Sequence, residues 1–128
     1  MTRFVIDPVG PPVRVIVEIA PSQQANIILT LTEADSSRQD QKNFDIVRGT
    51  SATWELPTSP SQLEMDSLHW KLIIGDIEEQ DVNYSANVRV VQGTKDIETV
   101  PCRGTFPKTR IAIEEGQGRF LFKASGAR

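Results

Sequence analysis

The chain of 128 residues contains one histidine, one cysteine and one tyrosine. Protein zinc sites need several cysteine or histidine ligands, so this chain cannot build one alone. A single cysteine also excludes an internal disulfide, whereas small secreted domains usually carry cysteines in even sets. The sequence therefore excludes zinc-binding and disulfide-rich scaffolds, and we expect no cofactor.

Long hydrophobic runs are missing as well. No run approaches the ~18–20 apolar residues of a membrane-spanning helix. The N-terminal segment reaches Asp7 without the apolar stretch of a signal peptide. We therefore expect no membrane span and, by default, a cytoplasmic location.

The chain also has no excess of positive charge. Its 17 acidic residues outnumber its 14 basic ones, which gives a net charge of −3 and a pI of about 5.1. General nucleic-acid binding relies on a basic surface that displaces counterions from phosphates. The charge therefore argues against a nucleic-acid partner.

The residues that are abundant favour β-strands. Valine and isoleucine together number 23, and β-branched side chains suit a pleated sheet. Apolar residues alternate with polar ones in several segments, namely 13–19, 27–32, 68–74, 82–90, 110–114 and 119–123. This alternation predicts strands with one buried face and one solvent face. We expect the apolar members, Ile111 and Ile113 among them, to face the core.

Proline and glycine separate these segments at regular intervals, which is typical of an all-β fold. Strands spaced in this way predict a single antiparallel β-sandwich domain over residues 1–128, immunoglobulin-like or jelly-roll-like, with roughly eight to nine strands. Ser59 and Pro60 fit the start of a short helical crossover near residues 59–66. Gly116 and Gly118 predict a hairpin turn within 110–123, and the polar stretch 33–42 predicts an exposed, mobile loop.

One strand resembles part of a known architecture. The segment from Tyr84 to Val90 is similar to a central strand of an immunoglobulin-like or fibronectin-type sandwich. Asp81, a few residues upstream, adds a resemblance to the tyrosine corner of those folds. The resemblance implies a fold and carries no function with it.

A row of hydrogen-bonding side chains follows the same strand. Asn83, Ser85, Asn87 and Arg89 alternate with apolar residues, so they share the solvent face. Such a row suits contact with another protein or with a glycan, and it is also common as an ordinary wet strand face. These four residues are the candidate binding site.

An acidic turn precedes that strand and offers a candidate calcium site. Asp76, Glu78, Glu79 and Asp81 supply the oxygen ligands that calcium prefers. Their spacing does not match the calcium loop of EF-hands, and acidic turns also keep sheet edges soluble. Calcium binding is therefore part of an alternative hypothesis only.

Catalytic residue types are scarce. His69 lies in the polar register of its strand, whereas Cys102 lies in the apolar register with Val100, where a buried thiol is inert. A Cys–His dyad would need both residues on one side of the sheet. Trp54, Trp70 and Tyr84 fall in core registers, which favours packing over a sugar-stacking platform.

These observations predict a non-enzymatic interaction or structural module that acts through an edge strand or a sheet face. Its partner would be another protein or a second copy of the chain. The alternative is a small-ligand or carbohydrate-binding module, assisted by calcium. A hydrolase is the least favoured reading.

Overall fold

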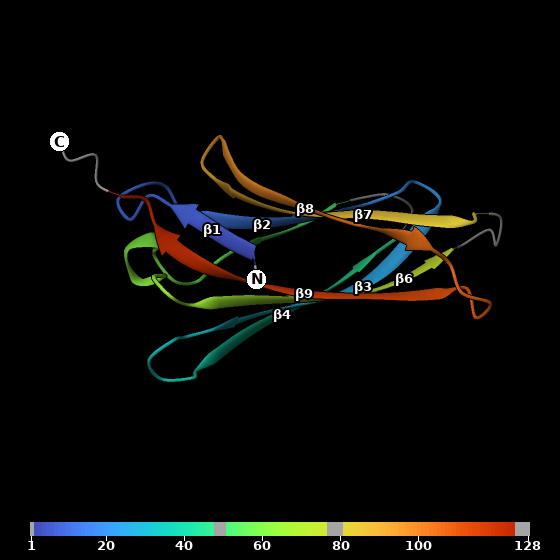
Figure 1. Ribbon diagram of the computed structural model, residues 1–128, viewed down its shortest axis with the longest axis horizontal. Helices are drawn as coiled ribbons and strands as arrows, with labels where there is room; N and C mark the ends of the chain where they lie inside the picture. Colours follow the sequence, from blue (N-terminus) through green and yellow to red (C-terminus); the bar gives the residue numbers. More distant parts are fainter. Residues whose placement is uncertain (1, 48–50, 77–80, 125–128) are drawn as a thin grey trace.

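The computed structural model describes residues 2–47, 51–76 and 81–124. Within them the chain forms nine strands, arranged in two packed sheets, and one 3-10 turn (Figure 1). This arrangement confirms the predicted all-β sandwich. The strands are β1 (Thr2–Ile6), β2 (Val13–Ile19), β3 (Gln23–Thr32), β4 (Gln39–Ile46), β5 (Ser51–Glu55), β6 (Ser67–Asp76), β7 (Asn83–Gln92), β8 (Lys95–Thr105) and β9 (Ile111–Phe122). The order is β1-β9-β6-β3-β4 in one sheet, here called sheet A, and β5-β2-β7-β8 in the other, sheet B.

The core lies between the sheets and follows the alternation of the sequence. Strands β2, β3, β6 and β7 bury every second residue along most of their length, as the period of two predicts. The inward side chains of both sheets form one hydrophobic cluster. Strand β7 pairs with β2 and β8, so it is central in its sheet, as its resemblance implied.

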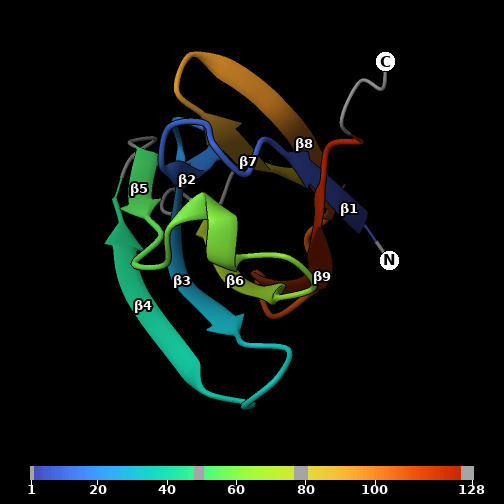
Figure 2. The same ribbon diagram turned by 90° about the vertical axis from the view of Figure 1, so that its left-hand side faces the viewer.

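The connections place the strands in their layers. The crossover from β5 in sheet B to β6 in sheet A contains a single 3-10 turn, Pro60–Gln62, at one end of the sandwich (Figure 2). The next residue, Leu63, is fully buried and anchors this crossover in the core. Strands β7 and β8 are joined by a two-residue turn in which Gly93 has a φ of 63°. That φ favours glycine at the first position of a tight hairpin turn.

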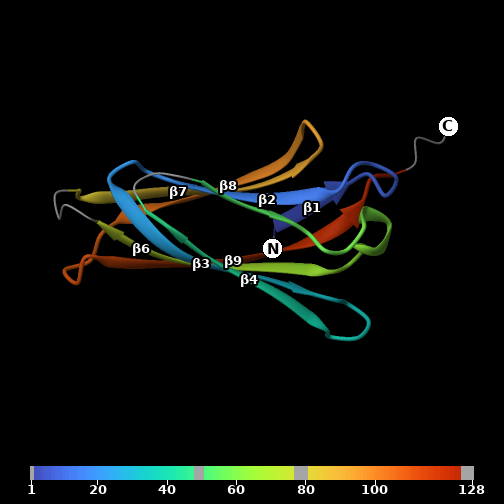
Figure 3. The same cartoon turned by 180° about the vertical axis from the view of Figure 1, so that it is seen from behind.

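Two features depart from the sequence predictions. Strand β1 pairs with β9 in parallel, whereas every other pairing is antiparallel among the described residues. The polar stretch 33–42 is a loop only as far as residue 38, because β4 begins at Gln39 and forms a hairpin with β3. This hairpin extends away from sheet B (Figure 3).

Strand β9 contradicts the prediction in both register and shape. It is one continuous strand of 12 residues, so the predicted hairpin around Gly116 and Gly118 does not form. Its inward residues include Ala112, whereas Ile111 and Ile113 are 51% and 59% exposed on the outer face. The expectation that these isoleucines face the core was therefore wrong.

The inward glycines of β9 explain this register, because they leave space for aromatic rings of neighbouring strands. Trp70 of β6 lies directly opposite Gly116, and a Cβ atom at Gly116 would come within 2.4 Å of the indole Cζ2. A Cβ at Gly118 would likewise come within 2.3 Å of the Phe4 ring. Neither glycine has a positive φ, so it is the missing side chain that matters rather than backbone freedom. Rings from neighbouring strands fill the space that inward side chains of β9 would otherwise take.

This packing makes Gly116→Ala a destabilising change. Trp70 is 4% exposed and its indole packs against the Phe4 ring, so overpacking should lower the free energy of unfolding by about 1–3 kcal/mol. Urea denaturation measures this value. Gly75→Ala is the matched control, because its nearest neighbour, the Gln24 side chain, lies at an ordinary 3.5 Å. Equal losses in the two variants would contradict the role assigned to Gly116.

Candidate functional site: a half-open sheet edge

Strand β9 is paired along only part of one edge. Strand β6 covers Ile111–Arg119 on one side, whereas β1 reaches only from Gly118 to Phe122 on the other. Among the described residues, no strand pairs with the first half of β9 on the β1 side. In Figure 1, β1 lies beside only the C-terminal part of β9, and the rest of β9 extends past it. The unpaired stretch, residues 111–117, is called the open edge below.

The hydrogen bonds at the far end of β9 show which backbone groups point to the open edge. The Phe120 amide donates to the carbonyl of Asp66, on the β6 side, at 2.9 Å. The Lys123 amide donates to the carbonyl of Ile6, on the β1 side, at 2.7 Å. These directions alternate along a strand, and the β6–β9 register is continuous. The amide and carbonyl groups of Ile111, Ile113 and Glu115 therefore face outward from the open edge.

The other long edges of the sandwich carry features that oppose strand addition. In β8 the Phe106 amide donates to Val82, on the β7 side, so by alternation Pro101 directs its nitrogen to the free edge, where it offers no donor. Arg103 adds an exposed charge two residues on. Strand β4 carries Asp40 and Lys42 along a polar edge. The open edge of β9 has neither proline nor lysine within residues 111–117.

An apolar surface adjoins the open edge on the outer face of sheet A. Ile111 and Ile113 are exposed there, and Ile113 lies directly opposite the half-buried Ile73 of β6. An exposed edge strand that is hydrophobic on its outer face favours pairing with another chain. The backbone groups and the side chains at this edge therefore both favour pairing with a strand of another chain.

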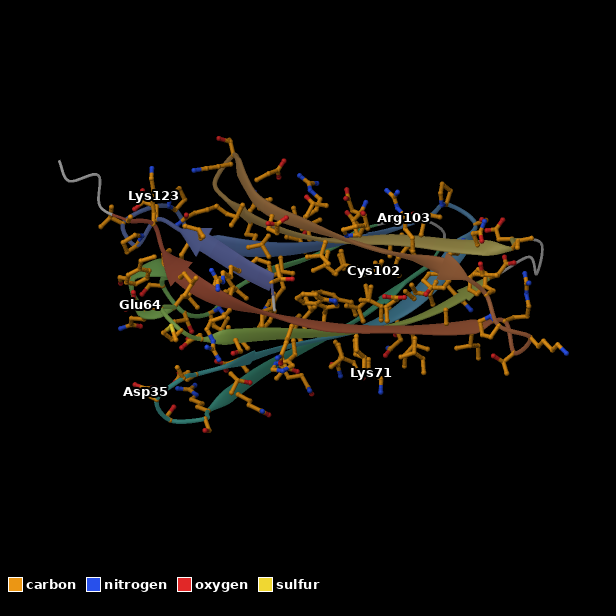
Figure 4. All side chains as sticks on the ribbon, in the orientation of Figure 1. Asp35, Glu64, Lys71, Cys102, Arg103 and Lys123 are labelled. Carbon is orange, nitrogen blue, oxygen red and sulfur yellow. The ribbon has the colours of Figure 1, made fainter. Side chains whose placement is uncertain are left out.

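On the inner side, the open edge borders a shallow, largely open groove of about 700 Å³ between β8 and β9. Its walls include Trp70, Val100 and Cys102 from the core and Glu114 and Gly116 from β9. Figure 4 shows Cys102 between the two layers and Lys71 on the outer side of sheet A. A strand added to β9 would direct alternate side chains into this groove.

The groove contains a carboxylate that bridges the two sheets. The Tyr84 hydroxyl of β7 donates a hydrogen bond to Glu114 Oε2 of β9. This bond is the main cause that raises the pKa of Tyr84 to about 12, with burial and the negative charge of Glu114 adding to it. Burial raises the pKa of the Cys102 thiol to about 11, and the charge of Glu114 adds to that shift as well. Because the Tyr84 hydroxyl bonds Glu114, it does not form the tyrosine corner that Asp81 suggested.

The predicted polar row lies together on the outer face of sheet B. Asn83, Ser85, Asn87 and Arg89 alternate with buried residues along β7, as expected. Several of their polar groups are already engaged: Asn83 Oδ1 accepts from the hydroxyl of Thr105 at 3.1 Å. Arg89 pairs with Asp96 at 2.8 Å and with Glu18 at 3.4 Å. No observation yet tests this row as a binding site.

The acidic turn is only partly described. Glu78 and Glu79 lie outside the described residues. The carboxylate of Asp76 is buried and pairs with Arg110 at 2.5 Å, and it also accepts from the amide of Asp81 at 2.7 Å. Within the part of the chain that the structure describes, no three Asp, Glu, His or Cys side chains are grouped as a metal site requires. Calcium binding by this turn stays an untested prediction.

The two candidate catalytic residues lie apart. His69 is exposed on the outer face of sheet A, whereas Cys102 is 3% exposed and faces inward from sheet B. Sheet A separates them, so they do not form a dyad. Trp70 and Tyr84 are buried and Trp54 is half-buried, in agreement with their core registers.

The open edge is not predicted by the sequence. The signal in the sequence was the row of small or short inward residues in β9, Ala112, Gly116 and Gly118, between outward isoleucines and polar residues. That β1 stops short of covering β9 is a property of the three-dimensional pairing. It has no local signature in the sequence.

No protein-family model, curated protein or solved structure matches this chain. Among the described residues, no helix has the length and apolar character that crossing a membrane requires.

The single tyrosine allows a direct test of the Tyr84–Glu114 bond. Its phenolate absorbance should titrate at about pH 12 in the folded protein, and near pH 10 in urea. Because the pKa is higher in the folded state, this bond stabilises the fold fully below pH ~10, and the effect is lost as the pH rises through about 12.

Glu114→Gln should bring the midpoint of that titration down, whereas Glu115→Gln, on the outer face of the same strand, should leave it unchanged. Circular dichroism recorded alongside the titration shows whether the chain is still folded. A midpoint near 10 in the folded parent protein would refute the bond.

Proposed function

We propose that this protein is a non-enzymatic interaction module that binds an extended segment of a partner protein along the open edge of β9. The observation that carries this proposal is the outward-facing backbone of Ile111, Ile113 and Glu115, beside exposed isoleucine side chains. Addition of a strand to an exposed sheet edge is a recurrent mode of peptide recognition. Main-chain hydrogen bonds supply affinity in this mode, and alternate side chains supply specificity.

The remaining features of the molecule agree with a binding role. The separation of His69 from Cys102 removes the nucleophilic dyad that the residue types allowed. The outer face of sheet B offers a second polar surface, but its arginine is paired with two acidic residues. The open edge combines unpaired backbone, apolar side chains and an adjacent groove, so it is the better site for a partner.

A proline at the open edge tests this function. Ile113→Pro should remove one outward amide and place a ring at the edge, while the pairing with β6 is kept. Pro101 already occupies the equivalent type of position in β8. Linear peptides selected from a random library against the parent protein should bind this variant at least about tenfold more weakly, which is ~1.4 kcal/mol.

Thr99→Pro is the matched control, because Thr99 occupies an outward position on the edge of β8. Peptide affinity should be unchanged in it. If the selected peptides bound Ile113→Pro as well as the parent, or if selection yielded no binder, the open edge would not be the binding site. Sedimentation velocity on all three proteins separates peptide binding from self-association, which Ile113→Pro would also abolish if a second copy occupied the edge.

A further inference from the structure

The groove beneath the open edge contains a negative charge that no basic side chain of the described residues balances. Glu114 is half-buried, and its one recorded partner is the neutral hydroxyl of Tyr84. Among the described residues, no lysine, arginine or histidine forms an ion pair with it. Its neighbour Glu115, by contrast, faces the outer surface and pairs with Lys71 at 3.8 Å.

The immediate surroundings of Glu114 do not balance its charge. Trp70, Val100 and Cys102 line the same groove, and none of them carries a charge that could balance Glu114. The charge also acts on its neighbours, since it contributes to the raised pKa values of Tyr84 and Cys102. A half-buried carboxylate of this kind gains most from a cation with hydrogen-bond donors.

Strand β1 shows how the edge of β9 receives a strand. It pairs in parallel, Thr2 with Gly118 and Phe4 with Phe120, and its inward side chain Phe4 is fully buried across Gly118. A strand added beside the open edge would follow the same alternation. The residue opposite Glu114 would then point into the groove, and its two neighbours would face outward beside Ile113 and Glu115.

We propose that the partner segment carries a lysine or arginine at the position that faces Glu114. Its two neighbours in the segment face outward, and the one beside Ile113 is apolar. This inference rests on the proposed function and defines the chemistry of its partner. The long stem of a basic side chain would pack against the apolar walls of the groove while its charged end reaches the carboxylate. The open edge would thus select basic, extended segments over acidic ones.

The position of β1 allows this preference to be measured within one chain. If the direction of Thr2–Ile6 continues ahead of Thr2, a short β-forming extension fused before Met1 runs along the open edge. If the register of β1 continues, the third residue ahead of Met1 faces Glu114. Three fusions that differ only at this residue, lysine, glutamine or glutamate, form the test set.

The readout is the amide exchange rate of Ile113 and Glu115, which slows when a strand pairs with the open edge. We expect protection in the order lysine, glutamine, glutamate, with about tenfold between the first and the last, equivalent to ~1.4 kcal/mol. In a Glu114→Gln background this order should disappear. In an Asp40→Asn background it should persist, because that carboxylate lies on β4, at the opposite border of sheet A.

The outcomes separate the two proposals. Equal protection by all three fusions would show that the edge accepts a strand without charge selection, so the inference would fail while the proposed function stands. An order that survived Glu114→Gln would also overturn the inference. If none of the three fusions slowed exchange at Ile113, the edge would not accept a strand, and the proposed function itself would fail.

Discussion

Phe4, Trp70 and Tyr84 each lie across a glycine of a neighbouring strand, and the architecture depends on these three contacts. Gly118, Gly116 and Gly104 leave the space that the rings occupy between the sheets. Because Gly104 has no side chain, the Tyr84 hydroxyl passes over β8 and reaches Glu114 in the opposite sheet. Because these rings take the place of inward side chains in β9, the isoleucines of β9 lie at the alternate, outward positions. The buried packing and the exposed apolar edge therefore have one cause.

The sequence predicted the layers well and the edge poorly, for a physical reason. Alternation identifies a buried face when inward residues are larger and more apolar than outward ones, which holds for β2, β3, β6 and β7. In β9 the inward positions 116 and 118 are glycines whose space is filled by rings of other strands, and position 112 is alanine, so the larger Ile111 and Ile113 gave the wrong face. Glycine also signals turns in most contexts, which predicted a hairpin where a continuous strand exists.

Edges are set by pairing between distant segments, and three of the four border strands carry features that oppose association. Strand β8 carries a proline that directs no donor outward, β4 is polar and charged, and β5 is short. Only β9 combines partial cover with apolar side chains among the described strands. Local sequence gives the composition of each strand, but which strand is left uncovered depends on where β1 ends.

The parallel pairing of β1 with β9 has a mechanical consequence. Tension applied at Thr2 and at Phe122 pulls these two strands along their own axes in opposite directions. All five residue pairs between them are then loaded together, in shear, instead of separating one after another as in the unzipping of a hairpin. A molecule that is held at one end and carries its load at the other would thus resist extension at the strand pair that borders its open edge.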